Sequence, residues 1–130
     1  MLRLRLLSLF LDVLLCAGAA DLIGLAATGG IWRYVPAARG LIPAVWAAAA
    51  AAATVAFLLR DASGGLSRRW FALEIRRADG ALPGPAGSLR RNLPLLIPGW
   101  NLYDAWPALK DGGSSRRSDQ AAGTRILRGV

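Results

Sequence analysis

The sequence predicts a mainly α-helical membrane protein with two transmembrane helices, a broken third hydrophobic segment and a small two-stranded β element. The 130 residues are 55% hydrophobic with a mean hydropathy of +0.39, and the apolar residues are concentrated in long blocks. The 16 basic residues, set against 8 acidic ones, lie mostly between these blocks. We therefore expect a single membrane domain over residues 1–130.

The first apolar block, residues 4–28, predicts a membrane-spanning helix, because about 20 residues at 1.5 Å rise cross the hydrocarbon core. Two acids interrupt the block, Asp12 within it and Asp21 near its outer end. We expect Asp21 to be an interfacial residue, and the alternative is that it belongs to an ion path. A secretory signal peptide with a small-residue cleavage site at 17–19 is the alternative. Asp12 counts against it, since an acid weakens the hydrophobic region of a signal peptide.

The second apolar block, residues 41–59, carries no charge and predicts a second spanning helix. It contains seven consecutive alanines, residues 47–53. Small side chains let another helix approach closely, and Ala20 and Gly24 on the first helix form a candidate contact surface for it.

The central segment, residues 60–92, is basic and rich in turn residues. Within it, residues 70–75 lead into a turn at 78–80, which favours a short strand. Residues 124–128, in the polar tail 110–130, predict a second strand. We expect the two strands to pair into a small cytoplasmic sheet.

The third apolar block, residues 93–109, contains Pro94, Pro98-Gly99 and Pro107. The Pro98-Gly99 break leaves halves too short to span alone, so we expect a re-entrant, interfacial or short transmembrane segment. Its aromatic side chains suit the level of the lipid headgroups. Asp104, within this block, is expected to be exposed at the interface, and the alternative is that a re-entrant segment brings it to the helix bundle.

The distribution of basic residues predicts orientation and partners. The central segment has seven arginines, whereas the 29–40 loop has two. The positive-inside rule then places the N-terminus and the central basic loop in the cytoplasm and the 29–40 loop outside, for a multi-pass protein of the cell (inner) membrane. Arginines that flank apolar blocks favour anionic lipid headgroups as partners over nucleic acid.

The residue types argue against catalysis. The chain has no histidine and one cysteine, Cys16, which removes imidazole chemistry and the usual zinc ligands. Its glycines do not form a phosphate-binding loop. We therefore expect no enzyme activity, cofactor or metal.

Four segments in order carry a resemblance to a known family. Residues 5–12 have an arginine at the start of the helix and an aspartate seven residues later, and 65–75 are followed by an Asp-Gly turn at 79–80. Residues 88–93 contain Leu-Arg-Arg-Asn, and 117–124 contain an aspartate followed by Ala-Gly-Thr. Together these segments resemble the RDD family of small membrane proteins, over nearly the whole chain. The sequence departs from that pattern at Ser67 and Ser118, where glycine is usual.

The resemblance implies a multi-pass membrane protein with a suspected role in transport, sodium/proton exchange having been proposed for some members. Arg5, Asp12 and Asp119 match the charged positions of its motifs and form the candidate site. Asp12 is either a protonatable or cation-binding carboxylate, or a structural partner of Arg5 or of another segment. For Asp119, an architectural role in the cytoplasmic part is expected, with Arg68, Arg69, Arg90 or Arg91 as its partner.

Two helices cannot enclose a pathway, so transport requires a homo-oligomer or other membrane proteins as partners. The leading hypothesis is ion or small-solute transport with proton or cation exchange at Asp12. The alternative is a non-transporting accessory or scaffold subunit of a membrane complex.

Overall fold

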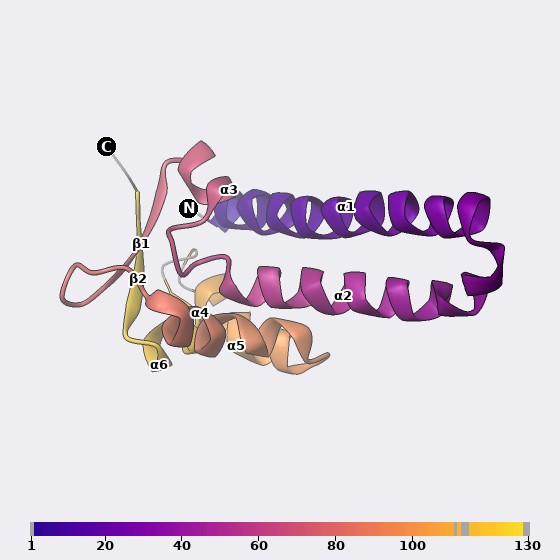
Figure 1. The fold of residues 1–130 in the computed structure, drawn as a ribbon. Coiled ribbons are helices and arrows are strands. Elements are labelled where there is room, and N and C mark those ends of the chain that lie inside the picture. The colour runs from indigo at the N-terminus through magenta and orange to yellow at the C-terminus, as the bar shows by residue number, and fades with distance from the viewer. Residues whose placement is uncertain (1, 111, 113–114, 129–130) are drawn as a thin grey trace. The chain divides into compact units, whose positions relative to one another are not determined.

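The computed structural model describes residues 2–110, 112 and 115–128 and is mainly helical (Figure 1). The chain divides into two compact units. Unit 1 comprises Met1–Asp12 and Leu58–Val130, and unit 2 comprises Val13–Phe57.

Unit 2 contains most of the two long helices. Helix α1 extends over Leu2–Tyr34, a 3-10 helix η1 over Pro36–Leu41, and α2 over Ile42–Leu59. Within unit 2, α1 and α2 run side by side in opposite directions (Figure 1). By length and composition, α1 and the helical stretch Pro36–Leu59, which combines η1 and α2, are long and apolar enough to cross a membrane.

Helix α1 is longer than the predicted 4–28, and the expected 29–40 loop is mostly helical. Gly29-Gly30 does not end the helix, since glycine weakens a helix by only about 1 kcal/mol relative to alanine. The break comes at Val35, because the residue before a proline is disfavoured in the α conformation. Pro36 then begins η1.

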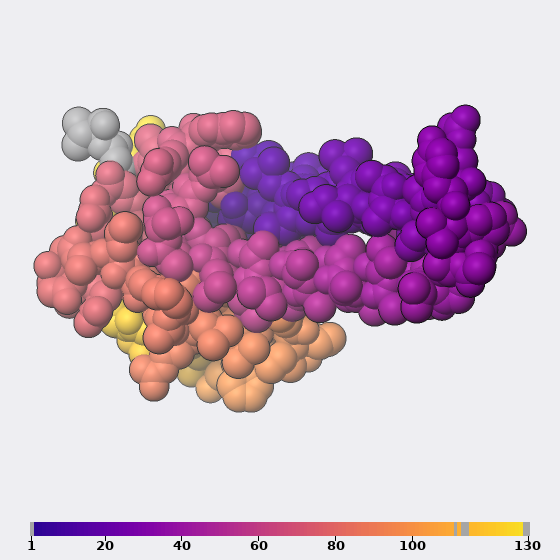
Figure 2. All heavy atoms as spheres, viewed as in Figure 1, coloured from indigo at the N-terminus to yellow at the C-terminus, as the bar shows by residue number. Residues whose placement is uncertain are grey.

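In unit 2, α2 contacts α1 at a glycine. The Trp46 ring lies against Gly24, where an added Cβ would come within 2.9 Å of a ring carbon. Further along the pair, a groove of about 340 Å³ is lined largely by alanines, including Ala20 and Ala49. Figure 2 shows the surfaces of the two helices meeting along part of their length. Of the predicted contact surface, Gly24 therefore meets α2 through Trp46, whereas Ala20 lines the groove.

Unit 1 adds four short α-helices and a second 3-10 helix among its described residues. They are α3 (Leu66–Trp70), α4 (Gly84–Asn92), η2 (Leu93–Leu96), α5 (Trp100–Lys110) and α6 (Arg117–Ala121). Helix α4 lies in the central segment, which is rich in turn residues and was not predicted to contain a helix. It begins directly after Pro83. Pro85 takes one of the first two helical positions, where a missing N–H costs no hydrogen bond.

The third apolar block is broken as predicted at Pro98-Gly99. Gly99 has φ of +82°, a conformation that favours glycine, and separates η2 from α5. Pro107, in contrast, does not interrupt α5. Its ring removes one hydrogen bond from a helix that has only three residues left.

The two predicted strands form an antiparallel pair, β1 (Leu73–Arg77) with β2 (Thr124–Arg128), in which Ile75 faces Ile126. β1 begins later than the expected 70–75 because residues up to Trp70 belong to α3. Leu73, Ile75 and Ile126 form the small hydrophobic core of unit 1. Of the predicted polar tail 110–130, residues 111, 113–114 and 129–130 lie outside the described residues.

Candidate functional site

Outside the small core beneath the sheet, the interior of unit 1 is polar and ionic. Its large apolar side chains lie mostly on the surface, whereas charged side chains from both ends of the sequence are buried together. We call this set the ionic network: Arg5, Arg60, Arg68, Arg91 and Arg116 with Asp12, Asp61, Asp104 and Asp119.

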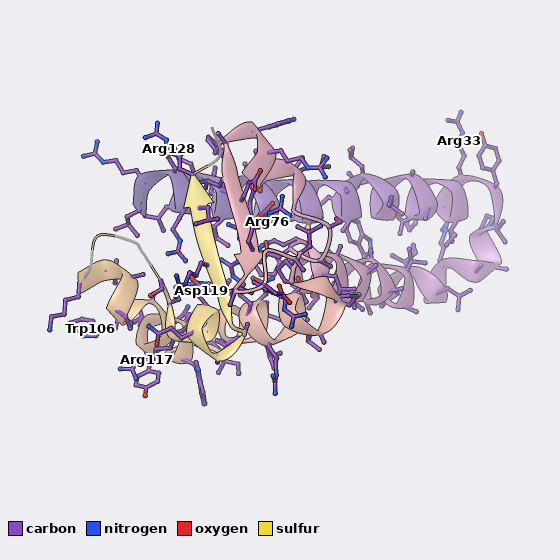
Figure 3. All side chains as sticks on the ribbon, turned by 90° about the vertical axis from the view of Figure 1, so that its left-hand side faces the viewer. Arg33, Arg76, Trp106, Arg117, Asp119 and Arg128 are labelled. Carbon is purple, nitrogen blue, oxygen red and sulfur yellow. The ribbon has the colours of Figure 1, made fainter. Side chains whose placement is uncertain are left out.

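Asp119 forms one centre of the network. It is fully buried, and its carboxylate accepts a hydrogen bond from Arg5 at 2.6 Å and pairs with the Nε of Arg91 at 2.7 Å. The backbone N–H of Arg116, at the start of α6, donates to the same carboxylate at 3.0 Å. In Figure 3, Asp119 points into the interior of unit 1, whereas Arg117 points away from it.

These contacts identify the partners of two predicted site residues. Of the arginines expected to pair with Asp119, Arg91 does so, and Arg5 is a further partner. The carboxylate also joins α1, α4 and α6, elements that lie far apart in the sequence.

Asp61, directly after α2, forms the second centre. Arg68 donates to its carboxylate at 2.7 Å and Asn92 at 3.0 Å, while Arg91 and Arg60 lie 3.7 and 3.8 Å away. Asp61 is fully buried. It is therefore held by three arginines.

Asp12 lies at the edge of the network. The Nε of Arg60 is 3.1 Å from its Oδ2, and the hydroxyl of Ser67 donates to its Oδ1. Ser8, one turn earlier on α1, lies 3.0 Å from the same hydroxyl. The structure thus gives Asp12 an arginine from another segment, while Arg5 binds Asp119.

Asp104 does not lie exposed at the interface, as the sequence had suggested. It is buried, and it accepts hydrogen bonds from the backbone N–H of Ser118 at 2.6 Å and from the Ser118 hydroxyl at 2.9 Å. Arg116 lies 3.6 Å from it. The prediction was wrong because α5 turns Asp104 toward α6, while Trp100, Tyr103 and Trp106 stay exposed.

Helix α4 closes the end of α2. Ser88 and Asn92 donate to the carbonyl of Leu58 at 2.7 and 3.1 Å, which satisfies one of the last carbonyls of the helix. Ser88 also accepts from the backbone N–H of Asp61 at 3.1 Å, and Asn92 accepts from Arg60 at 2.9 Å. These bonds fix the Arg60-Asp61 pair at the base of α2.

The two centres of the network stay ionised. Burial alone would raise the pKa of Asp61, but Arg68, Arg91 and Arg60 hold it well below its usual range. The pKa of Asp119 is likewise lowered, against the effect of burial, by Arg91, Arg116 and Arg5. Burial lowers the pKa of Arg91 to about 9, against the opposing effect of Asp119 and Asp61, so Arg91 remains charged at neutral pH.

Arg60 and Asp61 are not among the site residues predicted from the sequence. Their place in the sequence could have identified them, because an Arg-Asp pair follows directly after an uncharged helix. Ser67 and Ser118, the departures from the family pattern, both donate hydroxyl hydrogen bonds to aspartates of the network. Asp21 lies outside the network and is exposed.

Among the described residues, no group of three or more carboxylate or cysteine side chains is arranged to hold a metal ion. No family model, curated protein or solved structure matches the chain. The geometry of the ionic network and the composition of α1 and α2 are therefore the features that bear on function.

Proposed function

We propose that this chain is an integral membrane protein of the RDD type in which Asp12 exchanges a proton or a small cation. The membrane location is supported by α1 and by residues 36–59, whose most apolar stretches are only 11% and 6% buried. A core helix of a soluble protein is mostly buried, so apolar helices with this much exposure fit a lipid environment. The orientation proposed from the arginines puts unit 1 at the cytoplasmic side.

The proposal that Asp12 exchanges a proton or a cation is supported mainly by the surroundings of its Oδ2 atom. This oxygen is buried and accepts no hydrogen bond among the described residues, although Arg60 neutralises it from 3.1 Å. A buried carboxylate oxygen that accepts no hydrogen bond can take up a proton as O–H, or it can bind a cation in place of the arginine.

Arg60 has a second acid within reach when Asp12 is neutralised. Its Nε is 3.8 Å from the Asp61 carboxylate, so a small movement transfers the arginine from one acid to the other. Asp61 stays ionised because its pKa is held low by its arginines. The proposed cycle is an alternation in which Arg60 pairs with Asp12 when that carboxylate is empty and with Asp61 when it is occupied.

Transport by this route requires an oligomer, since two helices do not enclose a pathway. The rival function is that of an accessory or scaffold subunit. One observation favours it: the ionic network ties together segments over the full length of unit 1, which is what a purely structural role requires.

The test is proton and sodium flux in liposomes reconstituted with the purified protein. We expect Asp12→Asn, which keeps the size and removes the charge, to abolish flux while the protein remains folded in the same oligomer. Asp21→Asn is the matched control, because Asp21 lies on the same helix but is exposed. Absence of flux in the wild type at several pH values and matched incorporation would favour the accessory role.

A further inference from the structure

Helix α5 buries its polar side and exposes its apolar side. Its one acid, Asp104, is buried against α6. Residues two positions to either side of Asp104 lie about 200° around the helix and therefore point the opposite way. That opposite side is apolar, with exposed fractions between 49% and 68%. We call it the aromatic face: Leu102, Tyr103, Trp106 and Leu109.

A helix on the surface of a soluble domain has the reverse arrangement, with its apolar side inward. In α5 the orientation is fixed by Asp104, which accepts two hydrogen bonds from Ser118 and has Arg116 3.6 Å away. A rotation that buried Trp106 would break these contacts. The medium outside the aromatic face should therefore be less polar than water.

The chain directly before α5 does not suit the hydrocarbon core of a membrane. Residues 97–99 are exposed and not helical, and Gly99 has φ of +82°. Irregular backbone in contact with lipid does not occur in the hydrocarbon region, because its polar groups would lack partners there. Helix α5 has 11 residues, about 16 Å at 1.5 Å rise, which is roughly half the thickness of the core. The headgroup layer fits both observations.

Basic side chains border the aromatic face. The guanidinium carbon of Arg117 lies 4.1 Å from the centre of the Tyr103 ring, and Arg117 donates to the Tyr103 hydroxyl at 3.0 Å. Lys110 ends α5 and is exposed. Figure 3 shows Trp106 and Arg117 at the outside of unit 1. The only acid in residues 93–110 is the buried Asp104, so this border is positively charged and complements anionic headgroups.

We propose that α5 lies along the surface of an anionic membrane, with its aromatic face in the headgroup layer and Arg117 and Lys110 against lipid phosphates. The third apolar block is then interfacial and not spanning. This placement depends on the membrane location proposed above, but not on exchange at Asp12. A second copy of the chain is a poorer occupant of the same face, because it would bring its own basic residues into the contact.

The experiment measures the depth of Trp106 by fluorescence quenching. The full-length protein is reconstituted into vesicles of phosphatidylcholine and phosphatidylglycerol, whose acyl chains carry bromine either near the headgroup or near the chain end. Trp106 is made the only tryptophan by replacement with phenylalanine at the other four positions: Trp32, Trp46, Trp70 and Trp100. We expect the shallow bromines to quench Trp106 about twofold more than the deep ones. Stronger quenching by the deep bromines would overturn the interfacial placement, and quenching by neither would overturn contact with lipid.

A tryptophan on α2 separates this proposal from the membrane location on which it depends. Ala51 is exposed in the middle of α2, and Ala51→Trp in a chain without other tryptophans should be quenched most by the deep bromines. If that tryptophan is quenched and Trp106 is not, the membrane location stands and the placement of α5 is wrong. If neither is quenched, the membrane location is wrong as well.

The charged border is tested with bromine carried only by phosphatidylglycerol or only by phosphatidylcholine, at equal fractions in the same mixture. The ratio of the two quenching efficiencies reports how strongly the anionic lipid is enriched beside Trp106. One basic residue near the surface favours anionic lipid by about fivefold, so we expect Arg117→Gln to lower the enrichment by up to this factor. Arg90→Gln, on α4 and also exposed, is the matched control and should leave it unchanged. Equal enrichment in the wild type and Arg117→Gln would overturn the role of Arg117.

Discussion

The replacement Asp119→Asn tests whether the ionic network holds unit 1 together. Asparagine keeps the shape of the side chain and one carbonyl oxygen, so the backbone hydrogen bond from Arg116 can persist. The negative charge shared by Arg5 at 2.6 Å and Arg91 at 2.7 Å is lost. Both arginines are buried, so water cannot replace the carboxylate without rearrangement.

The size of the effect follows from this burial. Removing one partner of a buried ion pair typically costs about 3–5 kcal/mol, because the remaining charge is left uncompensated. A folded domain is stable by only about 5–15 kcal/mol. The variant should therefore lose a large part of the free energy of unfolding of unit 1.

The assay is reversible unfolding in mixed micelles, followed by the fluorescence of the five tryptophans. The matched control is Asp79→Asn, whose carboxylate pairs with Arg77 at 3.6 Å with both side chains more than half exposed. Such surface pairs contribute about 0–1 kcal/mol. If Asp119→Asn destabilised the protein no more than Asp79→Asn does, the network would not be the structural centre of unit 1.

Three further predictions use the same unfolding assay. Ser67→Ala should cost about 1–3 kcal/mol, because a buried carboxylate loses its hydroxyl donor, and an unchanged stability would contradict that hydrogen bond. Gly24→Leu should cost about 1–3 kcal/mol by overpacking against Trp46, whereas Gly18→Leu, with nothing within 4 Å of its Cβ position, should not; equal effects would contradict the contact. The pKa of Asp61 is lower in the folded than in the unfolded protein, so its contribution to stability is complete above the unfolded value of about 3.9 and is lost as the pH falls through the folded value. Stability should therefore be level between pH 7 and 5 and fall below pH 4, and Asp61→Asn should reduce that fall.

The parts of the fold that the sequence predicted are those with a local signal. Two long apolar blocks gave α1 and α2, the Pro98-Gly99 break divided the third block, and two runs of strand-forming residues gave the sheet. Helix α4 was missed because its sequence has weak helix propensity. Tertiary hydrogen bonds from Ser88 and Asn92 to the end of α2 stabilise it instead.

The site was only partly predictable for a related reason. Asp12 and Asp119 stood out by their context, one in an apolar helix and the other in a family-like motif. Which arginine meets which aspartate depends on how segments far apart in the sequence pack, and no periodicity encodes that. Asp104 is the clearest example of a contact that the sequence does not predict, because its burial depends on Ser118, which belongs to another helix.

The pairing of Arg5 with Asp119 across 114 positions bears on how the protein is made. At about 5–20 residues per second, a ribosome needs roughly 6–23 s to reach Asp119 after Arg5 has been added. Throughout that interval Asp119, which pairs with Arg5 in the folded protein, has not yet been synthesised. The fold of unit 1 is therefore completed late in synthesis, and a chain that stops before Asp119 leaves Arg5 and Arg91 without this shared acid.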